Sequence, residues 1–406
     1  MKKLILFLLP AFFFAACEEP DVILKDAEPI PLKVGMEKRV QQDNEFAFDL
    51  FRKTIALTDE KNVFISPLSV SIALGMAWNG ADADTKAEME TALKMSGMTV
   101  DEINEYYQIM QTGLTKVDPS TTLNIANSLW YRLGFPVKSD YLQVNKNYFN
   151  AEIRELDFDK AGAVDTINAW CAEKTNDLIK EPLDRISADA VMYLINAIYF
   201  KGIWVKQFDK KQTFETNFNA EGGSQVKVDM MQQLDAFGYM EDDVAQYLDM
   251  PYGNKAFSMT AILPKAGKTT DDVLQAMDVQ KWEDALTGMT EQKVQVYFPK
   301  FKTKGKYELK DPLIEMGMVK AFSDEADFSK IADAKLLISR VIHSTYCDVN
   351  EKGTEAAAVT IIEVELTSMP EYPFFNANRP FVFVIRENST GVILFIGKMG
   401  QVEKYK

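Results

Sequence analysis

Residues 351–365, EKGTEAAAVTIIEVE, form the most informative stretch of the chain. In an extended strand every second residue faces the same way. One face would hold only uncharged residues: Thr354, Ala356, Ala358, Thr360, Ile362 and Val364. The other face would carry the charges, in the order Glu355, Ala357, Val359, Ile361, Glu363 and Glu365. The pattern predicts a segment that can enter a β-sheet with its uncharged face inward and its glutamates toward solvent.

Local preference within this segment is divided. Thr354 followed by alanines suits the start of a helix, with the threonine as the cap. The β-branched residues at 359–362 favour a strand instead. A segment that occupies two states fits this division, and so does a simple helix-to-strand junction. If the segment does occupy two states, small residues at Thr354 and Ala356 matter. A bulky or charged group there would slow the first steps of its insertion into a β-sheet.

Two other stretches of the sequence, one before this segment and one after it, predict strands. The sequence NRPFVFVIRENSTGVILFIGKM, at 378–399, indicates strands at 381–386 and 392–399 joined by a polar turn at 388–391. The sequence VMYLINAIYF, at 191–200, is typical of a long strand buried on both faces.

Apolar periodicity predicts the remaining elements. We expect helices at 43–61, from Ser66–Pro67 to 77, and at 83–93, 137–149, 165–179 and 310–316. We expect strands at 123–131, 225–231, 245–250, 257–263 and 293–298. Because helices come mostly early and strands mostly late, the chain is expected to be an α+β protein with large antiparallel sheets.

Composition excludes several functional classes. The 406 residues carry a net charge of −15, so nucleic acid and anionic membrane surfaces are poor partners. His343 is the single histidine, so a paired-histidine metal site cannot be built within one chain and a Ser-His-Asp triad would have to use it. No phosphate-binding loop and no CxxC pair occurs. Neither a metal nor a cofactor is expected.

The N-terminus has the pattern of an exported lipoprotein. Lys2 and Lys3 precede an apolar run at 4–14 that is short for a membrane span, and Ala15–Ala16 precede Cys17. We expect a signal peptide at 1–16, lipid on the Cys17 thiol and a flexible tether at 17–42. The expected location is the outer membrane, the cell surface or the periplasm, with the lipid as the only membrane contact. An ordinary signal peptide with an incidental cysteine is the alternative. Cys171 and Cys347 remain, and their pairing stays open.

Six segments, in order, resemble the serpin family. They are NVFISPLSVSIALGMAWNGADADTKAEM (62–89), LINAIYFKGIWVKQFD (194–209), PYGNKAFSMTAILP (251–264), VQVYFPKFK (294–302), EKGTEAAAVT (351–360) and the C-terminal stretch at 378–399. The resemblance covers about residues 43–402. It implies a large central β-sheet that accepts the reactive loop, about 351–377, as an added strand, with further sheets and eight or nine helices. It also implies that the protein is a monomer and a protease inhibitor rather than an enzyme. The inhibitor would be of the suicide type, with serine proteases as targets and cysteine proteases as a further class.

The resemblance assigns roles to single positions. The loop hinge would be Glu351, Gly353, Thr354, Glu355, Ala356, Ala357 and Ala358. The shutter beneath the opening sheet would be Ser66, Ser69, Asn196 and His343. The breach at the top of the sheet would be Trp204 and Lys300, with Lys300 the partner of Glu351. For Trp204, simple core packing is an equal alternative.

Three neighbouring bonds are candidates for the one that a protease would cut. Counting forward from the hinge gives Thr367–Ser368, which we prefer, and counting back from NRPFVF gives Met369–Pro370. Leu366–Thr367 is a close rival. No Lys or Arg occurs from Gly353 to Asn378, which disfavours trypsin-like targets and leaves elastase-, subtilisin-, chymotrypsin- and papain-like proteases.

Two alternatives remain beside the inhibitor. A non-inhibitory protein of the serpin fold that binds a ligand at the cell surface is the first, and the hinge composition disfavours it. An enzyme that uses carboxylates alone, such as a glycosidase, is the second. The ordered motifs disfavour it.

Overall fold

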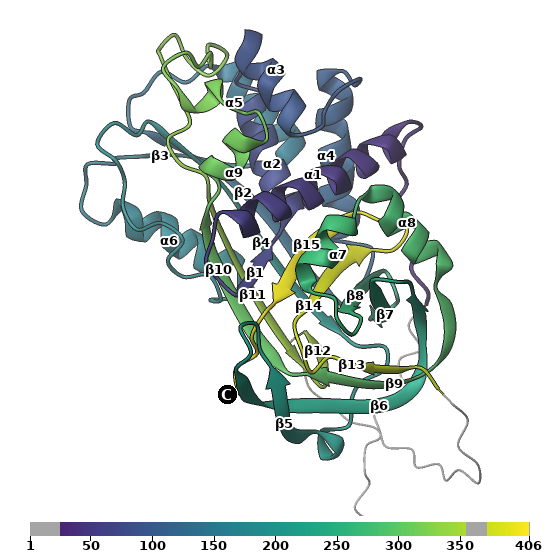
Figure 1. The fold of residues 1–406 in the computed structure, drawn as a ribbon. Helices are drawn as coiled ribbons and strands as arrows, with labels where there is room; N and C mark the ends of the chain where they lie inside the picture. The colour runs from purple at the N-terminus through teal and green to yellow at the C-terminus, as the bar shows by residue number, and fades with distance from the viewer. Residues whose placement is uncertain (1–24, 355–371, 406) are drawn as a thin grey trace, which may run out of the picture.

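The computed structural model describes residues 25–354 and 372–405. Helices α1–α5 and α9 gather at one end of the molecule, and strands β5, β6, β9 and β13 lie at the other (Figure 1). The helices of the described chain are α1 (Met36–Ala56), α2 (Pro67–Trp78), α3 (Ala83–Ala92), α4 (Val100–Leu114), α5 (Ser139–Phe149), α6 (Ala163–Lys174), α7 (Thr270–Ala276), α8 (Val279–Gly288) and α9 (Lys310–Glu315). Short 3-10 turns follow at Lys210–Gln212 and Lys320–Phe322. Nine helices in the described residues agree with the expected eight or nine.

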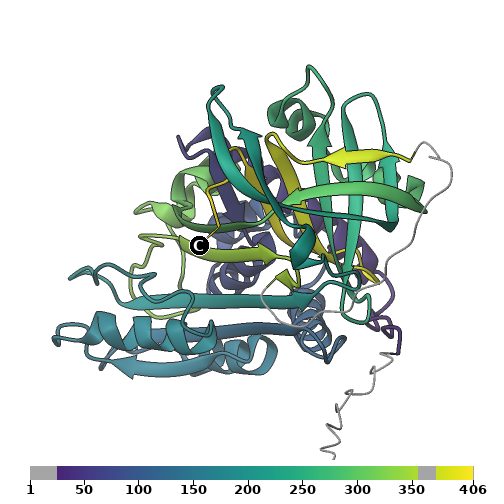
Figure 2. The same ribbon diagram turned by 90° about the horizontal axis from the view of Figure 1, so that it is seen from below.

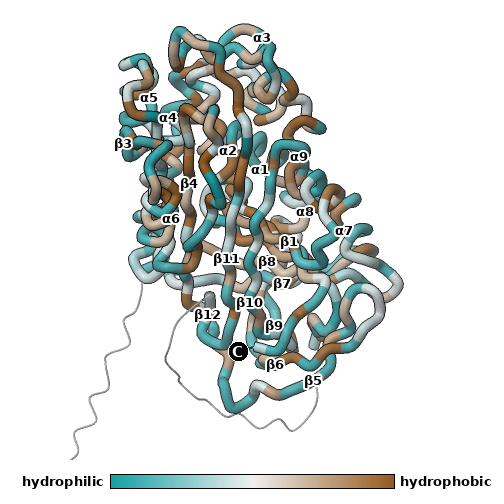
Figure 3. Tube along the Cα trace, turned by 90° about the vertical axis from the view of Figure 1, so that its left-hand side faces the viewer, coloured by the Kyte–Doolittle hydropathy of each residue, from teal (hydrophilic) through white to brown (hydrophobic). Residues whose placement is uncertain are grey.

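Six described strands form a long sheet, which we call the central sheet. Their order is β10 (Phe301–Glu308), β11 (Ile342–Asn350), β12 (Gly353–Thr354), β4 (Met192–Ile203), β2 (Thr122–Arg132) and β3 (Glu152–Leu156). Neighbours run antiparallel except β2 and β3, which are parallel. Strands β4, β11 and β10 lie side by side in Figure 3, with β12 at one end of β4 and β11.

A second sheet carries the C-terminal strands. Its order is β1 (Asn62–Ile65), β15 (Ile393–Met399), β14 (Phe381–Glu387), β8 (Phe257–Pro264), β7 (Ala245–Tyr252), β6 (Gln225–Glu241), β9 (Thr290–Pro299) and β13 (Phe374–Asn376), with β5 (Phe214–Asn219) paired to β6. Strands β14 and β15 are buried along their whole length, as their apolar runs predicted.

Helix α2 lies within the hydrophobic core of the molecule. Ser66 caps it by accepting a hydrogen bond from the Ser69 amide, and Pro67 occupies the first helical position. Nearly every residue of α2 is buried, because it packs against β4 on one side and β15 on the other. A helix that is apolar all round has to be enclosed in this way.

Helix α6 covers the opposite face of the central sheet (Figure 2). Its residues Ile167 and Trp170 join a small buried cluster against which Tyr193 and Ile195 of β4 pack. Strand β4 therefore alternates, with even-numbered residues toward α2 and odd-numbered residues toward α6.

Two expectations from the sequence were wrong in detail. Helix α1 begins at Met36 and Ile30 is already buried, so packed structure starts before residue 43 and the predicted tether at 17–42 is too long. Strand β4 is not buried on both faces throughout, since 192–196 are only half-buried.

Candidate functional site

Strands β4 and β11 are joined, within the described residues, only through β12. Thr354 pairs with Val349 of β11 on one side and with Gly202 of β4 on the other. Below this pair the described chain contains no residue of β4 registered with a residue of β11. We call the space between these two strands, from Thr354 downward, the slot. It explains why the first half of β4 is only half-buried.

The turn that leads from β11 into β12 is fixed by a buried ion pair. Glu351 lies in this turn, and its carboxylate is 3.1 Å from the Lys300 ammonium and accepts a 2.9 Å hydrogen bond from Thr213. Its side chain is 4% exposed. Burial works to raise the pKa of Glu351, but hydrogen bonds from a backbone amide, Lys300 and Thr213 outweigh it, so the net pKa is lowered. Glu351 is therefore held as a carboxylate.

Gly353 and Thr354 show why the hinge needs small residues. Gly353 has a φ of 142°, and a Cβ there would lie 2.2 Å from the Gly202 carbonyl oxygen. Thr354 is buried, and its hydroxyl is 3.0 Å from the Tyr252 hydroxyl. The Thr354 side chain thus points toward the core at the top of the slot.

Trp204 closes the top of the slot. Its indole nitrogen donates to the Asn350 carbonyl at 3.0 Å, and its ring stacks on Tyr252 with centroids 4.3 Å apart. Its backbone amide donates to the Lys352 carbonyl at 2.9 Å. Trp204 therefore does more than fill the core, because it contacts both ends of the hinge turn.

The four predicted shutter residues lie in one hydrogen-bond network beneath the slot. The Ser66 amide donates to His343 Nε2 at 2.9 Å, and the Ser69 hydroxyl donates to Asn196 Oδ1. Ser66 and Ser69 are linked in turn by the helix cap. His343 is fully buried and burial lowers its pKa to about 4, so it is neutral and accepts through Nε2. His343 and Asn196 reach the network from opposite walls of the slot.

This network includes a residue that sequence reasoning missed. Asn196 donates to Asn127 Oδ1 at 2.6 Å, and Asn127 donates to Gln111 and to the Phe149 carbonyl, also at 2.6 Å. An asparagine inside the apolar strand 123–131 was the available signal, because a buried amide needs partners.

A family model described as Serpin (serine protease inhibitor) matches residues 41–402. The chain belongs to the serpin family.

Curated serpins and solved serpin structures match almost the whole chain. An uncharacterized serpin-like protein of Methanosarcina acetivorans is 37% identical over 380 residues, which cover 88% of this chain and 86% of the relative. The leukocyte elastase inhibitor of Bos taurus is 35% identical, with 90% and 99% covered. The crystal structure of the thermophilic serpin tengpin in the native state matches with a TM-score of 0.84 and 33% identity, covering 93% of this chain and 97% of that one.

Several positions predicted for this serpin lie outside the described residues. They are the hinge residues Glu355, Ala356, Ala357 and Ala358, the bond candidates Leu366, Thr367, Ser368 and Met369, and the lipidation candidate Cys17. The two other cysteines are described, and both Cys171 and Cys347 are free and buried.

No group of His, Cys, Asp and Glu in 25–354 or 372–405 has the arrangement of a metal site. In the same residues, no helix is both long enough and apolar enough to cross a bilayer.

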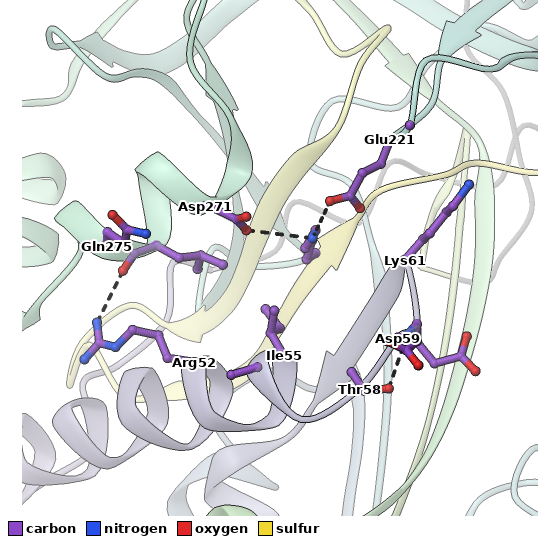
Figure 4. A pocket seen from close by; sticks show the side chains of 13 residues that line it. Arg52, Ile55, Thr58, Asp59, Lys61, Glu221, Asp271 and Gln275 are labelled. Atoms are coloured by element: carbon purple, nitrogen blue, oxygen red, sulfur yellow. Dashed lines mark hydrogen bonds and ion pairs between the residues drawn. The ribbon is translucent and has the colours of Figure 1, made fainter.

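A surface hollow of about 570 Å³ lies beside the end of α1 (Figure 4). Its basic groups have partners within the chain: Lys398 pairs with Glu221 at 2.9 Å, and Arg52 pairs with Asp49 at 2.6 Å. The lining carries four carboxylates, Asp59, Glu60, Glu221 and Asp271, beside three basic side chains, so it presents no cluster of one charge sign.

Proposed function

We propose that this serpin inhibits proteases by accepting its own cleaved loop into the slot. The observation that carries the proposal is β12, a strand of two residues that already lies between β11 and β4. The chain that follows Thr354 would need only to continue this strand. Membership of a family with inhibitory members, such as the leukocyte elastase inhibitor, supports the same reading.

The register of β12 says where each further residue would lie. Since Thr354 pairs with Val349 and Gly202, continuing the ladder places residue 360 between His343 and Asn196. The loop's Thr360 would thus arrive directly over the buried shutter network. We infer that this network holds β4 and β11 in place until the strand arrives.

The same register supports the charge pattern. Thr354 faces the core, so residues 356, 358, 360, 362 and 364 would face it too, and none is charged. On the outer face, Ile361 would lie between Ile195 and Ile342, both of which pack against the cluster under α6. The apolar residue Ile361 would therefore meet the cluster under α6, and Glu363, two positions further on, would lie beside Tyr193, which packs against the same cluster.

The mechanism asks for no catalytic residue in the inhibitor. A target protease attacks the loop as a substrate and forms an acyl-enzyme. Insertion of the freed strand then competes with deacylation, which takes roughly 1–1000 ms at typical turnover rates. His343 supports this reading, because it is fully buried, neutral and bonded to the Ser66 amide, so it cannot act as a general base on an outside substrate.

For the cut bond we propose Thr367–Ser368, with Leu366–Thr367 and Met369–Pro370 as rivals. Proteases of the elastase, subtilisin, chymotrypsin or papain type are the proposed targets, since residues 353–378 contain no Lys or Arg. We also propose export as a lipoprotein anchored through Cys17. Mass spectrometry of the mature N-terminus would test this, and an unmodified Cys17, or cleavage elsewhere, would contradict it.

The decisive experiment mixes the protein with an elastase-like and a subtilisin-like protease. We expect an SDS-resistant covalent complex and a released C-terminal fragment that begins near Ser368. Clean cleavage with the protease fully active would instead favour a non-inhibitory binding protein of the same fold.

A further inference from the structure

The C-terminal tail, residues 400–405, returns across the central sheet to the hinge. Gly400 donates to the Lys61 carbonyl at 3.1 Å, and the Gln401 amide donates to the Asn62 side chain at 2.9 Å. Val402 is completely buried. The tail is thus fixed to the start of β1.

Tyr405 makes the last contacts of this tail. Its hydroxyl donates to Asp348 Oδ1 at 2.7 Å, which ties the tail to β11. The Lys300 ammonium lies 4.2 Å from the centre of its ring, and the Lys302 ammonium lies 4.6 Å from it. One aromatic side chain therefore contacts Lys300, which lies between β9 and β10, Lys302 of β10 and Asp348 of β11.

We propose that Tyr405 is a positioning residue for the hinge. Its ring holds Lys300 in place, and Lys300 holds the carboxylate of Glu351 in the turn between β11 and β12. The inference rests on the proposed function, since it assigns the tail a part in setting how fast the loop enters the slot.

The ring acts on the ion pair in two ways. An ammonium over an aromatic face is attracted to it, most strongly where water is excluded. The ring also covers Lys300, whose side chain is only 16% exposed, and less water around the Lys300–Glu351 pair strengthens their attraction. A fixed Glu351 fixes the turn, and the turn sets the direction and register of any strand that continues from Thr354.

Three variants separate the ring from the rest of the tail. Tyr405→Leu removes the aromatic face and keeps apolar bulk. Tyr405→Phe keeps the ring and removes the two hydrogen bonds of the hydroxyl, the 2.7 Å bond to Asp348 and the 3.4 Å bond that it accepts from Asn350. The control is Lys404→Ala, which breaks an exposed 2.6 Å pair between Lys404 and Glu215 in the same tail.

Two measurements are made on each variant. The first is hydrogen exchange of the amides at 350–354, and the second is the fraction of cleaved inhibitor that traps an elastase-like protease. For Tyr405→Leu we expect exchange about two- to five-fold faster and the ratio of trapped to merely cleaved molecules lowered by a similar factor, the size of a single cation–π contact at the weak end of the usual range. Tyr405→Phe should restore both values to near wild type, and Lys404→Ala should leave them unchanged.

Equal behaviour of Tyr405→Leu and Tyr405→Phe would overturn the proposal, and so would an unchanged hinge in Tyr405→Leu. Faster exchange throughout the chain rather than at 350–354 would also overturn it, because Tyr405 would then only stabilise the fold as a whole. If wild-type protein traps no protease, the proposed function fails, but the exchange at 350–354 still decides whether Tyr405 positions the hinge.

Discussion

Thr354 is the residue on which insertion depends first. It is buried, its hydroxyl faces Tyr252, and it is the last described residue before the slot. Thr354→Arg would bury an unpaired charge at this point, which costs several kcal/mol. We expect the variant to be cleaved normally but to trap almost no protease, measured as the yield of SDS-resistant complex.

Thr354→Ser is the matched control for this prediction. It keeps the hydroxyl and adds no charge or bulk, so we expect trapping close to wild type. Undiminished trapping by Thr354→Arg would contradict loop insertion.

His343 makes stability depend on pH in a defined window. Burial lowers its pKa to about 4, whereas the unfolded chain has an ordinary histidine pKa near 6.5. Between these values only the unfolded state binds the proton, so stability falls as the pH falls. We expect a loss on the order of 2 kcal/mol in the free energy of unfolding from pH 7.5 to pH 5.

Urea unfolding at the two pH values measures this loss. His343 is the single histidine of the chain, so no other side chain has an unperturbed pKa in this window. His343→Gln should remove most of the pH dependence at a cost in stability at pH 7.5. The same slope in wild type and His343→Gln would show that the proton is taken up elsewhere.

At the scale of elements, the pairing of β12 predicts the register of the inserted loop against β11, and a disulfide can test that register. Residue 356 would lie opposite Cys347, two positions beyond the Thr354–Val349 pair. Facing residues of antiparallel strands have Cα atoms about 4.5–5.5 Å apart, within reach of a disulfide. Ala356→Cys should therefore cross-link to Cys347 in the loop-cleaved protein under a mild oxidant, detected as a linked peptide by mass spectrometry.

The control for this cross-link is the next position. Ala357→Cys would face the other side of the sheet, beside Tyr346, and should form no bond to Cys347. Both variants carry serine at Cys17 and Cys171 to exclude other pairings. Equal cross-linking at 356 and 357, or none at 356, would contradict the proposed register.

The elements that the sequence predicted well are those with a single strong pattern. Helix α2, and the pair β14 and β15, were confirmed because long apolar runs and a Ser-Pro cap leave few alternatives. Helix α4 was missed, although Thr99 and Glu102 form a capping box at its start. A search for that motif would have found it.

The start of α1 was misplaced for a different reason. Arg39 was included in a polar tether, but it is completely buried and paired with Asp43 at 2.6 Å. Tyr106 of α4 donates to the same aspartate at 2.7 Å. A charged residue becomes a core residue only when distant partners satisfy it, and a single sequence does not show such partners.

For the candidate site, the resemblance supplied the residues and the Lys300–Glu351 pair, but not how the shutter residues are connected to one another. Lys300 and Glu351 do form a pair, and Ser66, Ser69, Asn196 and His343 do share a network. That Asn196 and His343 stand on opposite walls of the slot follows only from the strand order. Sequence patterns fix which way a residue faces within a strand but not which strands are neighbours.

In the whole molecule, the described chain fills the slot between β4 and β11 only at its top, with β12. The loop that follows Thr354 has an uncharged face that suits the rest of the slot. Filling it would add a ladder of backbone hydrogen bonds on both sides and bury four apolar side chains, Val359, Ile361, Ile362 and Val364. Apolar burial of this kind contributes about 1.5–3 kcal/mol per side chain. The uncleaved protein is therefore expected to be less stable than the cleaved one.

Cleavage of the loop should consequently raise the melting temperature, by about 10 °C or more at the usual scaling for a large domain. Differential scanning calorimetry before and after limited cleavage near Ser368 measures the change. Cleaved Thr354→Arg is the internal control, because its loop is cut but cannot continue β12, so its melting temperature should stay near that of the uncleaved variant. If cleaved wild type melts at the same temperature as uncleaved protein, the strand does not enter the slot, and β12 is then only a short closing contact at the top of the central sheet.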